Sequence, residues 1–337
     1  MAESKEQALF SLSEILNIDR ELARYYLERT RWSLEGAINE YYSDTSENSE
    51  GKKASADKPP SYSQVQGETS SHSPSTVSSD GSQSLKFLCW NLDGLDSANL
   101  EERTIAVVEN ILLKKPDVVL LQEVVSLSLK IFQENCEGYN VLFGNHTFPY
   151  FNALLIRTST VQTKATSLQS VPFETSKMGR HYLIQPIKFA DAKIVLMTSH
   201  LESLAPNGGE RKKQFSEILD YMKRQSKNFN VVFGGDTNLR DTEVSAVGVP
   251  SGVLDAWTSC GSALTTKYTW NMAENDNNGN TYQKPPKYRF DRIFIRPAKE
   301  AKTIKPNTFA LVGKERLRGC NRFASDHWGI WLELSIH

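Results

Sequence analysis

The sequence lacks the features that mark membrane-spanning and secreted proteins. In its 337 residues, no apolar run approaches the ~18–20 residues that a membrane-spanning helix needs. The N-terminus has no apolar core of the kind found in signal peptides. The cysteines, Cys89, Cys136, Cys260 and Cys320, are scattered and form no CxxC pair, so we expect free thiols in a reducing compartment. These absences predict a nuclear or possibly cytoplasmic protein that makes no membrane contact, and we expect a monomer.

Residues 44–84 almost lack aliphatic side chains. Serine dominates this segment, and Pro and Gly are present, so no core can offset the entropy lost on ordering. We therefore predict a disordered Ser-rich linker between two domains. It contains Pro59-Pro60-Ser61-Tyr62, a PPxY string of the kind that WW domains bind, although biased segments also produce such strings by chance.

Residues 1–43 carry apolar side chains at helical spacing in three short stretches, which predicts a small three-helix module. The apolar positions are Leu9, Leu12, Ile15 and Leu16, then Leu22, Ala23, Tyr26 and Leu27, then Leu34, Ala37, Ile38, Tyr41 and Tyr42. The string Trp32-Ser33-Leu34-Glu35-Gly36-Ala37-Ile38 resembles ubiquitin-associated (UBA-like) domains, and this resemblance implies ubiquitin binding. A helical cap or a folding aid is the alternative.

From residue 85 to the C-terminus, strand-like apolar runs alternate with amphipathic stretches. The runs that predict strands are 86–90, 118–121, 139–143, 153–156, 193–197, 230–233 and 292–295. The clearest helical patterns cover 100–115 and 209–223. Strands and helices that interleave in this way predict a sheet-based α-β core with helices on its outer faces.

Polar side chains stand at the ends of several predicted strands, where a rigid scaffold presents chemistry. The site segments are Trp90-Asn91, Leu121-Gln122-Glu123, Ser199-His200, Gly235-Asp236-Thr237-Asn238 and Ser325-Asp326-His327. A single carboxylate at a strand end is often a helix cap, but this many placements in one domain favour one site. Phosphodiester hydrolysis needs a hard oxygen ligand for Mg²⁺, a base for water and donors to the phosphate oxygens. The segments supply all of these.

Carboxylates in these segments suit metal binding and general base catalysis. Glu123 is the expected ligand of Mg²⁺, with Mn²⁺ as a possible substitute, and Asp326 is a candidate second ligand. Asp236 is the candidate general base, and Asn238 is placed to orient the attacking water.

The remaining polar residues suit stabilisation of negative charge. Asn91 and His200 are candidate donors to the phosphate oxygens. His327 would act best when protonated, and Asp291, in Arg289-Phe290-Asp291-Arg292, would hold and charge it.

The net charge of −1 hides an asymmetry between the two parts of the chain. Residues 1–84 carry a balance of −6, and the rest carries +5. Within that part, the stretch 284–322 holds 12 basic residues against three acidic ones. A basic stretch near a phosphoesterase site favours a nucleic acid substrate, while a merely solvated surface is the alternative.

Together the site segments resemble the endonuclease/exonuclease/phosphatase superfamily, which includes deoxyribonuclease I, abasic-site endonucleases, sphingomyelinases and inositol-phosphate 5-phosphatases. The resemblance implies a DNase I-like four-layer sandwich, in which two stacked mixed β-sheets are flanked by helices, with a Mg²⁺ site at one rim. The wider strings around the segments resemble the 5′-tyrosyl-DNA phosphodiesterases, which also carry an N-terminal UBA-like module. These strings are Trp90-Asn91-Leu92-Asp93-Gly94-Leu95-Asp96, Ser199-His200-Leu201-Glu202-Ser203, Gly235-Asp236-Thr237-Asn238-Leu239-Arg240-Asp241 and Ser325-Asp326-His327-Trp328-Gly329.

This narrower resemblance covers residues 85–337 and implies a role for each matching position. The family's catalytic quartet falls on Asn91, Glu123, Asp236 and His327, with His200 and Ser203 as phosphate contacts and Asp326 beside the metal. Arg240 and Trp270 would line the DNA path, with Tyr150 as a further aromatic candidate. For Trp270, a place in the core is the alternative.

The sequence departs from the family pattern outside the quartet. Cys89 stands where Thr commonly precedes Trp-Asn, and Asn271 follows Trp270 where Asp is usual. Residues 273–287 are polar and rich in Asn and Gly, which predicts a flexible loop.

The resemblance implies hydrolysis of the bond between a 5′ DNA phosphate and a topoisomerase tyrosine, on ends that are single-stranded at the terminus. A topoisomerase-derived peptide on DNA, and ubiquitin bound by residues 1–43, would be the partners. The alternatives are another activity of the superfamily, or a ubiquitin-binding adaptor with an idle hydrolase domain. Carboxylates kept together without compensation argue against an idle site.

Overall fold

The structure is a computed structural model. It describes residues 84–144, 148–279 and 284–337, and in the N-terminal part residues 5, 8, 9, 12, 13, 18, 20–30, 32 and 37. The chain divides into two compact units, Met1–Ser82 and Gln83–His337. In the part described, no helix is long and apolar enough to cross a membrane. All four cysteines are described, and each is a free thiol.

The described part of the N-terminal unit contains helix α2 (Arg20–Arg29). Its buried residues are Ala23, Tyr26 and Leu27, as the helical spacing predicts, whereas Leu22 is 37% exposed. Most of the predicted third helix, the predicted linker up to residue 83 and its PPxY string lie outside the described residues.

One six-stranded sheet carries two of the site segments. Its strands β1 and β2 are parallel neighbours, and the other pairs are antiparallel. The order across the sheet is β14 (Ile304–Val312), β15 (Gly329–Ile336), β1 (Ser84–Asn91), β2 (Val118–Val124), β4 (Phe151–Arg157) and β3 (Tyr139–Phe143).

The second sheet carries the other strand-end segments. Its strands β8 and β9 are parallel neighbours. The order is β10 (Leu254–Asp255), β13 (Asp291–Arg296), β9 (Asn230–Asp236), β8 (Ala192–Ser199), β7 (His181–Phe189) and β5 (Gln162–Thr163), with β6 (Gln169–Pro172) also paired to β7. A separate two-stranded ribbon joins β11 (Trp270–Asn271) to β12 (Lys287–Tyr288).

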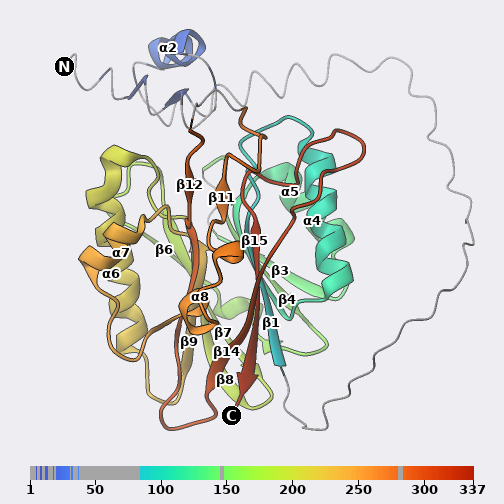
Figure 1. The fold of residues 1–337 in the computed structure, drawn as a ribbon, viewed down its shortest axis with the longest axis vertical. Helices are drawn as coiled ribbons and strands as arrows, with labels where there is room; N and C mark the ends of the chain where they lie inside the picture. Colours follow the sequence, from blue (N-terminus) through green and yellow to red (C-terminus); the bar gives the residue numbers. More distant parts are fainter. Residues whose placement is uncertain are drawn as a thin grey trace, which may run out of the picture. The chain divides into compact units, whose positions relative to one another are not determined.

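Helices cover the outer faces of the stacked sheets, with α4 and α5 on one side and α6 and α7 on the other (Figure 1). The helices are α4 (Leu100–Lys114), α5 (Ser126–Asn135), α6 (Gly208–Arg224), α7 (Asp241–Val247) and α8 (Ala256–Ser259). Short 3₁₀ turns lie at Ala165–Ser167, Ala205–Asn207 and Leu264–Thr266. The predicted arrangement of two mixed sheets between helical layers is confirmed.

The alternation of side chains along β1 builds the layers. Phe87 and Cys89 join the core between the two sheets, whereas Leu88 and Trp90 join the core beneath α4 and α5. Successive side chains of a strand point to opposite faces, so a strand buried on both sides is apolar throughout. A third core lies under α6, where Phe215, Ile218, Leu219 and Met222 follow the helical period.

All the predicted strands are present, and the two predicted helices match α4 and α6 closely. Strands β7, β14 and β15 lie outside the predicted runs. Pro186 lies within β7 and Pro306 within β14, and proline lowers the expectation of a strand because it has no N–H for the ladder.

Candidate active site

The parallel strand pairs bring the site segments to one rim. Parallel neighbours end at the same edge of a sheet, so β1 presents Asn91 beside Glu123 of β2, and β9 presents Asp236 beside the segment that follows β8. The Asn91 amide joins the two sheets. Its Nδ2 donates to Glu123 Oε1 at 3.0 Å and to Asp236 Oδ2 at 2.9 Å.

Glycines allow the close approach of backbones beneath this rim. A Cβ on Gly94 would overlap the carbonyl oxygen of Glu123, and a Cβ on Gly235 would overlap that of Ser199. Such contacts admit only glycine without a backbone shift. The glycines of the site segments therefore have a packing reason.

The C-terminal segment is fastened to the end of β1. Ser325 Oγ donates to the carbonyl of Asn91 at 2.6 Å and accepts from the backbone N–H of His327 at 3.0 Å. Trp90 Nε1 donates to the carbonyl of His327 at 2.8 Å. These buried bonds fix the position of the His327 ring.

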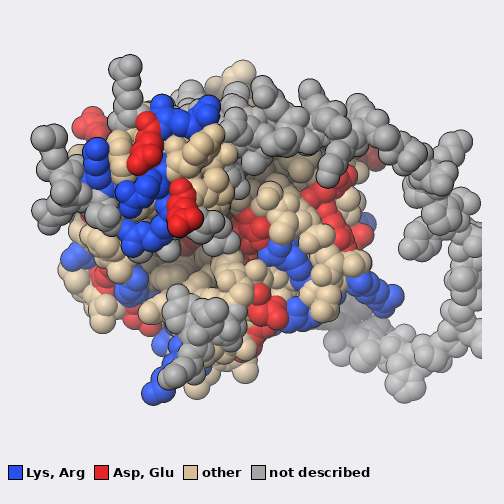
Figure 2. All heavy atoms as spheres, turned by 90° about the horizontal axis from the view of Figure 1, so that it is seen from above, with Lys and Arg blue, Asp and Glu red and all other residues tan. Residues whose placement is uncertain are grey.

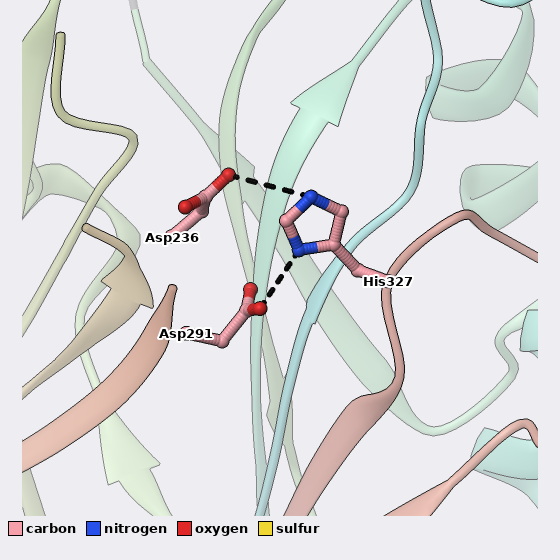
Figure 3. Close-up of side chains that lie close together, drawn as sticks. All are labelled: Asp236, Asp291 and His327. Atoms are coloured by element: carbon pink, nitrogen blue, oxygen red, sulfur yellow. Dashed lines mark hydrogen bonds and ion pairs between the residues drawn. The ribbon is translucent and has the colours of Figure 1, made fainter. Parts of the chain in front are cut away.

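The His327 ring lies between two buried carboxylates (Figure 3). Its Nδ1 is 2.7 Å from Asp291 Oδ2, and its Nε2 is 3.7 Å from Asp236 Oδ2. Asp236 and Asp291 are cross-strand partners in the β9–β13 ladder. The register of that ladder therefore places both acids around one imidazole.

Electrostatics favour the charged form of His327. Burial alone would lower its pKa, but the negative charges of Asp291, Asp326 and Asp236 outweigh burial and raise the pKa well above its ordinary value. Burial raises the pKa of Asp236 to about 6, although the charge of His327 opposes that rise. At neutral pH the arrangement is an imidazolium held between two carboxylates.

His200 is neutral and has a defined tautomer. Burial first, and then the charge of Arg180, lower its pKa well below the ordinary value. Arg180 Nη1 lies 2.8 Å from His200 Nδ1, and since arginine only donates, that nitrogen accepts. The His200 proton is therefore on Nε2, which lies 3.2 Å from Asp236 Oδ2. Asn238 is close by, with its Nδ2 3.0 Å from the same nitrogen and its backbone N–H bonded to Asp236 Oδ1 at 2.9 Å.

Glu123, Asp326 and Asp93 form a second acidic group beside this cluster. Burial, and then the charge of Asp326, raise the pKa of Glu123. The same two causes raise the pKa of Asp93 well above its ordinary value, and Asp93 Oδ2 is buried without a hydrogen-bond partner. Hard oxygen donors gathered out of solvent without enough positive charge fit a divalent cation such as Mg²⁺. Asp93 was not among the candidates from sequence, although it lies in the string that follows Asn91.

Asp236, Asp291 and His327 also bring ligand atoms within 4.8 Å of one another. We favour the carboxylate group around Glu123 for the cation, because a coordinating imidazole must present a lone pair. Both nitrogens of His327 face carboxylates, and an imidazolium has no lone pair to offer.

Asp326 is held by side chains from the ribbon and the loop between its strands. Trp270 Nε1 donates to Asp326 Oδ2 at 2.9 Å, and Asn278 Nδ2 donates to the same oxygen at 2.8 Å. Trp270 is half-buried beside the site, so its alternative placement in the core is wrong.

Other asparagines tie this loop to the segment before His327. Asn275 Nδ2 donates to the carbonyl of Ser325 at 2.8 Å, and Asn277 exchanges bonds with the backbone of Phe323. The described part of the predicted flexible loop, up to residue 279, is therefore fixed by side-chain bonds.

Arg180 connects two predicted substrate contacts. It donates to Ser203 Oγ at 3.2 Å, and its guanidinium carbon lies 5.1 Å from the centroid of the Tyr150 ring. Tyr150 itself is buried, and its hydroxyl donates to the carbonyl of Met178 at 3.2 Å. Arg180 precedes β7, a strand outside the predicted runs, so no strand-end signal pointed to it.

The basic stretch 284–322 does not form one continuous surface. Arg289, Arg292 and Arg296 are buried. The first two pair with Asp241 and Asp255. On the face seen in Figure 2, basic and acidic side chains are interspersed. Much of the basic excess is therefore neutralised inside the fold, and only part of it is available to a polyanion.

Comparison with known proteins agrees with this geometry. Residues 88–327 match the endonuclease/exonuclease/phosphatase family, and residues 6–48 match a UBA-like domain. Tyrosyl-DNA phosphodiesterase 2 of Homo sapiens is 35% identical over 335 residues, which cover 96% of this chain and 91% of that protein. The protein of the same name from Gallus gallus is 39% identical over 254 residues, which cover 75% of this chain and 67% of that protein.

Solved structures show the same relationship. The crystal structure of D. rerio TDP2 complexed with a single-strand DNA product has a TM-score of 0.71 and 38% identity, and it covers 74% of this chain and 98% of that chain. The structure of TDP2 from C. elegans has a TM-score of 0.67 and 29% identity, and it covers 98% of this chain and 93% of that chain. The chain therefore belongs to the endonuclease/exonuclease/phosphatase family, and within it to the tyrosyl-DNA phosphodiesterase 2 group.

Proposed function

We propose that this phosphodiesterase hydrolyses, with Mg²⁺, the bond between a 5′ DNA phosphate and a topoisomerase tyrosine, and leaves a 5′-phosphate end for double-strand break repair. The observation that carries the proposal is the Asn91 amide, which joins the proposed metal ligand Glu123 to the proposed base Asp236. The names of the relatives give the substrate class, and the site supplies chemistry that suits it.

Asp236 is the proposed base. It accepts bonds from Asn91, from the backbone N–H of Asn238 and from His200, so its carboxylate is held for proton transfer from a water. With a pKa of about 6 it is largely ionised at neutral pH while remaining basic enough to accept that proton. Asn238, adjacent to it, is placed to orient the water.

Donors on the other side of the site suit the phosphate. The His327 imidazolium and the Asn91 amide are placed to bond the phosphate oxygens, where charge builds in the transition state. His200, Ser203 and Arg180 are further proposed contacts of the phosphate, and Tyr150 supports Arg180 from behind. Glu123 and Asp326 would hold the cation with Asp93 close by, and a bound divalent cation would neutralise phosphate charge.

The leaving group explains why no strong general acid is needed. A phenol has a pKa of ~10, compared with ~15.7 for water, so tyrosinate departs readily. The main work left to the protein is to place the water in line and to offset the developing charge.

A substrate panel tests the activity. A 5′-phosphotyrosyl oligonucleotide, an abasic duplex, an inositol polyphosphate and sphingomyelin are each incubated with Mg²⁺ and with chelator. We expect cleavage of the phosphotyrosyl oligonucleotide alone, and only with Mg²⁺. Asp236→Asn should abolish it while the melting curve stays cooperative. Preference for another substrate would move the chain to a different activity of the superfamily.

We also propose a division of labour along the chain. Residues 85–337 would carry catalysis, residues 44–84 would act as a linker, and residues 1–43 would bind ubiquitin. A DNA-processing role is consistent with a nuclear location, which imaging of the tagged full chain would test.

A further inference from the structure

We propose that Tyr288, bordered by Arg240, Lys267 and Lys287, extends the DNA path beyond Trp270, so that the enzyme grips a single strand several nucleotides away from the scissile phosphate. The inference rests on the proposed function and adds a substrate-length preference to it. Of these residues, the sequence had suggested only Arg240 as a DNA contact.

Trp270, Tyr288 and Phe290 form an aromatic cluster that begins at the catalytic site. Tyr288 lies 6.1 Å from Trp270 and 4.9 Å from Phe290 between ring centroids, with interplanar angles of 20° and 21°. Trp270 is bonded to Asp326, and the carbonyl of Phe290 accepts from Thr237, next to Asp236. The near-parallel rings therefore lead away from the reacting centre.

The cluster differs from the aromatic residues of the core. Its three members are all half-buried, whereas Phe233 and Phe294 of the sheet core are fully buried. Half-buried rings keep part of their surface available for a ligand, and nucleobases stack on such rings without regard to sequence.

Cationic side chains border the cluster. The Arg240 guanidinium lies 5.5 Å from the Tyr288 centroid. Lys267 lies beside Arg240, because its Nζ is 3.4 Å from Asp241 Oδ2. Lys287 Nζ lies 4.7 Å from the centroid of Tyr268, the ring that Lys267 also approaches at 5.5 Å. Aromatic platforms edged by cations match the chemistry of a single-stranded nucleic acid, with bases on the rings and phosphates on the cations.

A single strand fits this surface better than a duplex, because paired bases are stacked on one another and cannot reach protein rings. The competing explanation is purely structural. The β11–β12 ribbon has only two strands, and such ribbons are marginal alone, so the rings would serve only to pack it. That explanation predicts equal effects of a Tyr288 substitution on short and long substrates.

Substrate length separates the two explanations. We would measure kcat/KM for 5′-phosphotyrosyl substrates carrying one nucleotide and about six nucleotides of thymidylate. In wild type the longer substrate should be preferred. In Tyr288→Ala the ratio of the two kcat/KM values should fall by about 5- to 150-fold, the factor that one lost base stack represents. Tyr288→Phe should keep the wild-type ratio. An unchanged ratio in Tyr288→Ala would overturn the proposal.

Equilibrium binding tests the cations independently of turnover. Fluorescence anisotropy with a 5′-phosphorylated oligothymidylate in chelator gives the slope of log K against log salt. Lys267→Gln and Lys287→Gln should each reduce that slope by about 0.7. The matched control is Lys130→Gln on α5, a side chain that is 70% exposed and pairs with Glu134, and it should leave slope and activity unchanged. Slopes equal to wild type in both variants would contradict the proposed border.

The two levels of hypothesis fail in different ways. If wild type hydrolyses neither substrate, the proposed function is wrong, yet the anisotropy series still decides whether Tyr288 and the lysines bind a strand. If wild type hydrolyses both with equal efficiency, the function stands and the extended path does not.

Discussion

Replacing Asp291 with Asn tests the electrostatics of the site most directly. Asp291 is the largest source of the raised pKa of His327, and it also raises the pKa of Asp236. Asn keeps the shape and can still accept a bond from His327 Nδ1, but it carries no charge. The pKa values of both groups should therefore fall together.

The size of the effect follows from the contact. Asp291 Oδ2 and His327 Nδ1 are 2.7 Å apart, and both side chains are buried. Unit charges about 4 Å apart at an effective dielectric constant of about 20 interact by ~4 kcal/mol. Loss of most of this support would leave His327 largely neutral at neutral pH, and loss of one charged donor to the phosphate lowers kcat by about 10²–10³-fold.

The assay is the pH dependence of kcat/KM on a phosphotyrosyl oligonucleotide. In wild type we expect activity to rise through an acid limb near pH 6, set by ionisation of the coupled Asp236–His327 pair. Activity should fall again at high pH, when His327 loses its proton. In Asp291→Asn both limbs should move to lower pH, because each pKa loses the same negative neighbour.

The control is Asp220→Asn, an acid on α6 with a side chain that is 57% exposed, which should leave both limbs in place. If Asp291 only orients the ring, Asp291→Asn would lower the rate without moving either limb, and the electrostatic reasoning would be refuted. Melting curves of both variants show whether the fold is kept.

Three further predictions concern the metal, the phosphate and ubiquitin. Mg²⁺ at about 100 times its Kd should stabilise wild type by ~2.7 kcal/mol, roughly 5–10 °C in Tm for a domain of this size, and Glu123→Gln should lose most of this rise in differential scanning fluorimetry; an equal rise in the variant would place the cation elsewhere. Arg180→Lys should lower kcat/KM by about 10- to 100-fold, because lysine cannot bond His200 and Ser203 with one planar group, and steady-state kinetics that match wild type would remove Arg180 from the site. Ubiquitin titrated into ¹⁵N-labelled residues 1–43 should shift amide signals of α2 and its neighbours, and unchanged spectra would leave the module without its proposed ligand.

The strands predicted from sequence share one property, which is a continuous apolar run. Val118–Val124 is buried on both faces and rich in Val and Leu, so its composition alone indicates a central strand. Strand β14 alternates buried and exposed positions around Pro306 at the edge of its sheet. Its pairing depends on β15, a distant partner, and sequence alone does not reveal it.

The same limit applies to the site. Asn91, Glu123 and Asp236 were predictable because they end buried strands. Arg180 reaches the site from the loop before β7, and Asp93 turns into it through a left-handed backbone conformation with φ of 51°. Neither feature leaves a signal in the spacing of apolar residues.

The site depends on how the two sheets are stacked, because the proposed metal ligand and the proposed base belong to different sheets. Beneath Asn91, a buried bond of 3.0 Å from Gln122 Nε2 to Thr198 Oγ1 joins β2 of the first sheet to β8 of the second. Gln122 precedes Glu123, and Thr198 lies two residues before His200. A polar bond in an apolar core is costly to leave unmade, so it favours the one stacking register in which it forms. That register also sets the separation of Glu123 and Asp236, and thus the packing between the sheets and the geometry of catalysis are fixed by the same contacts.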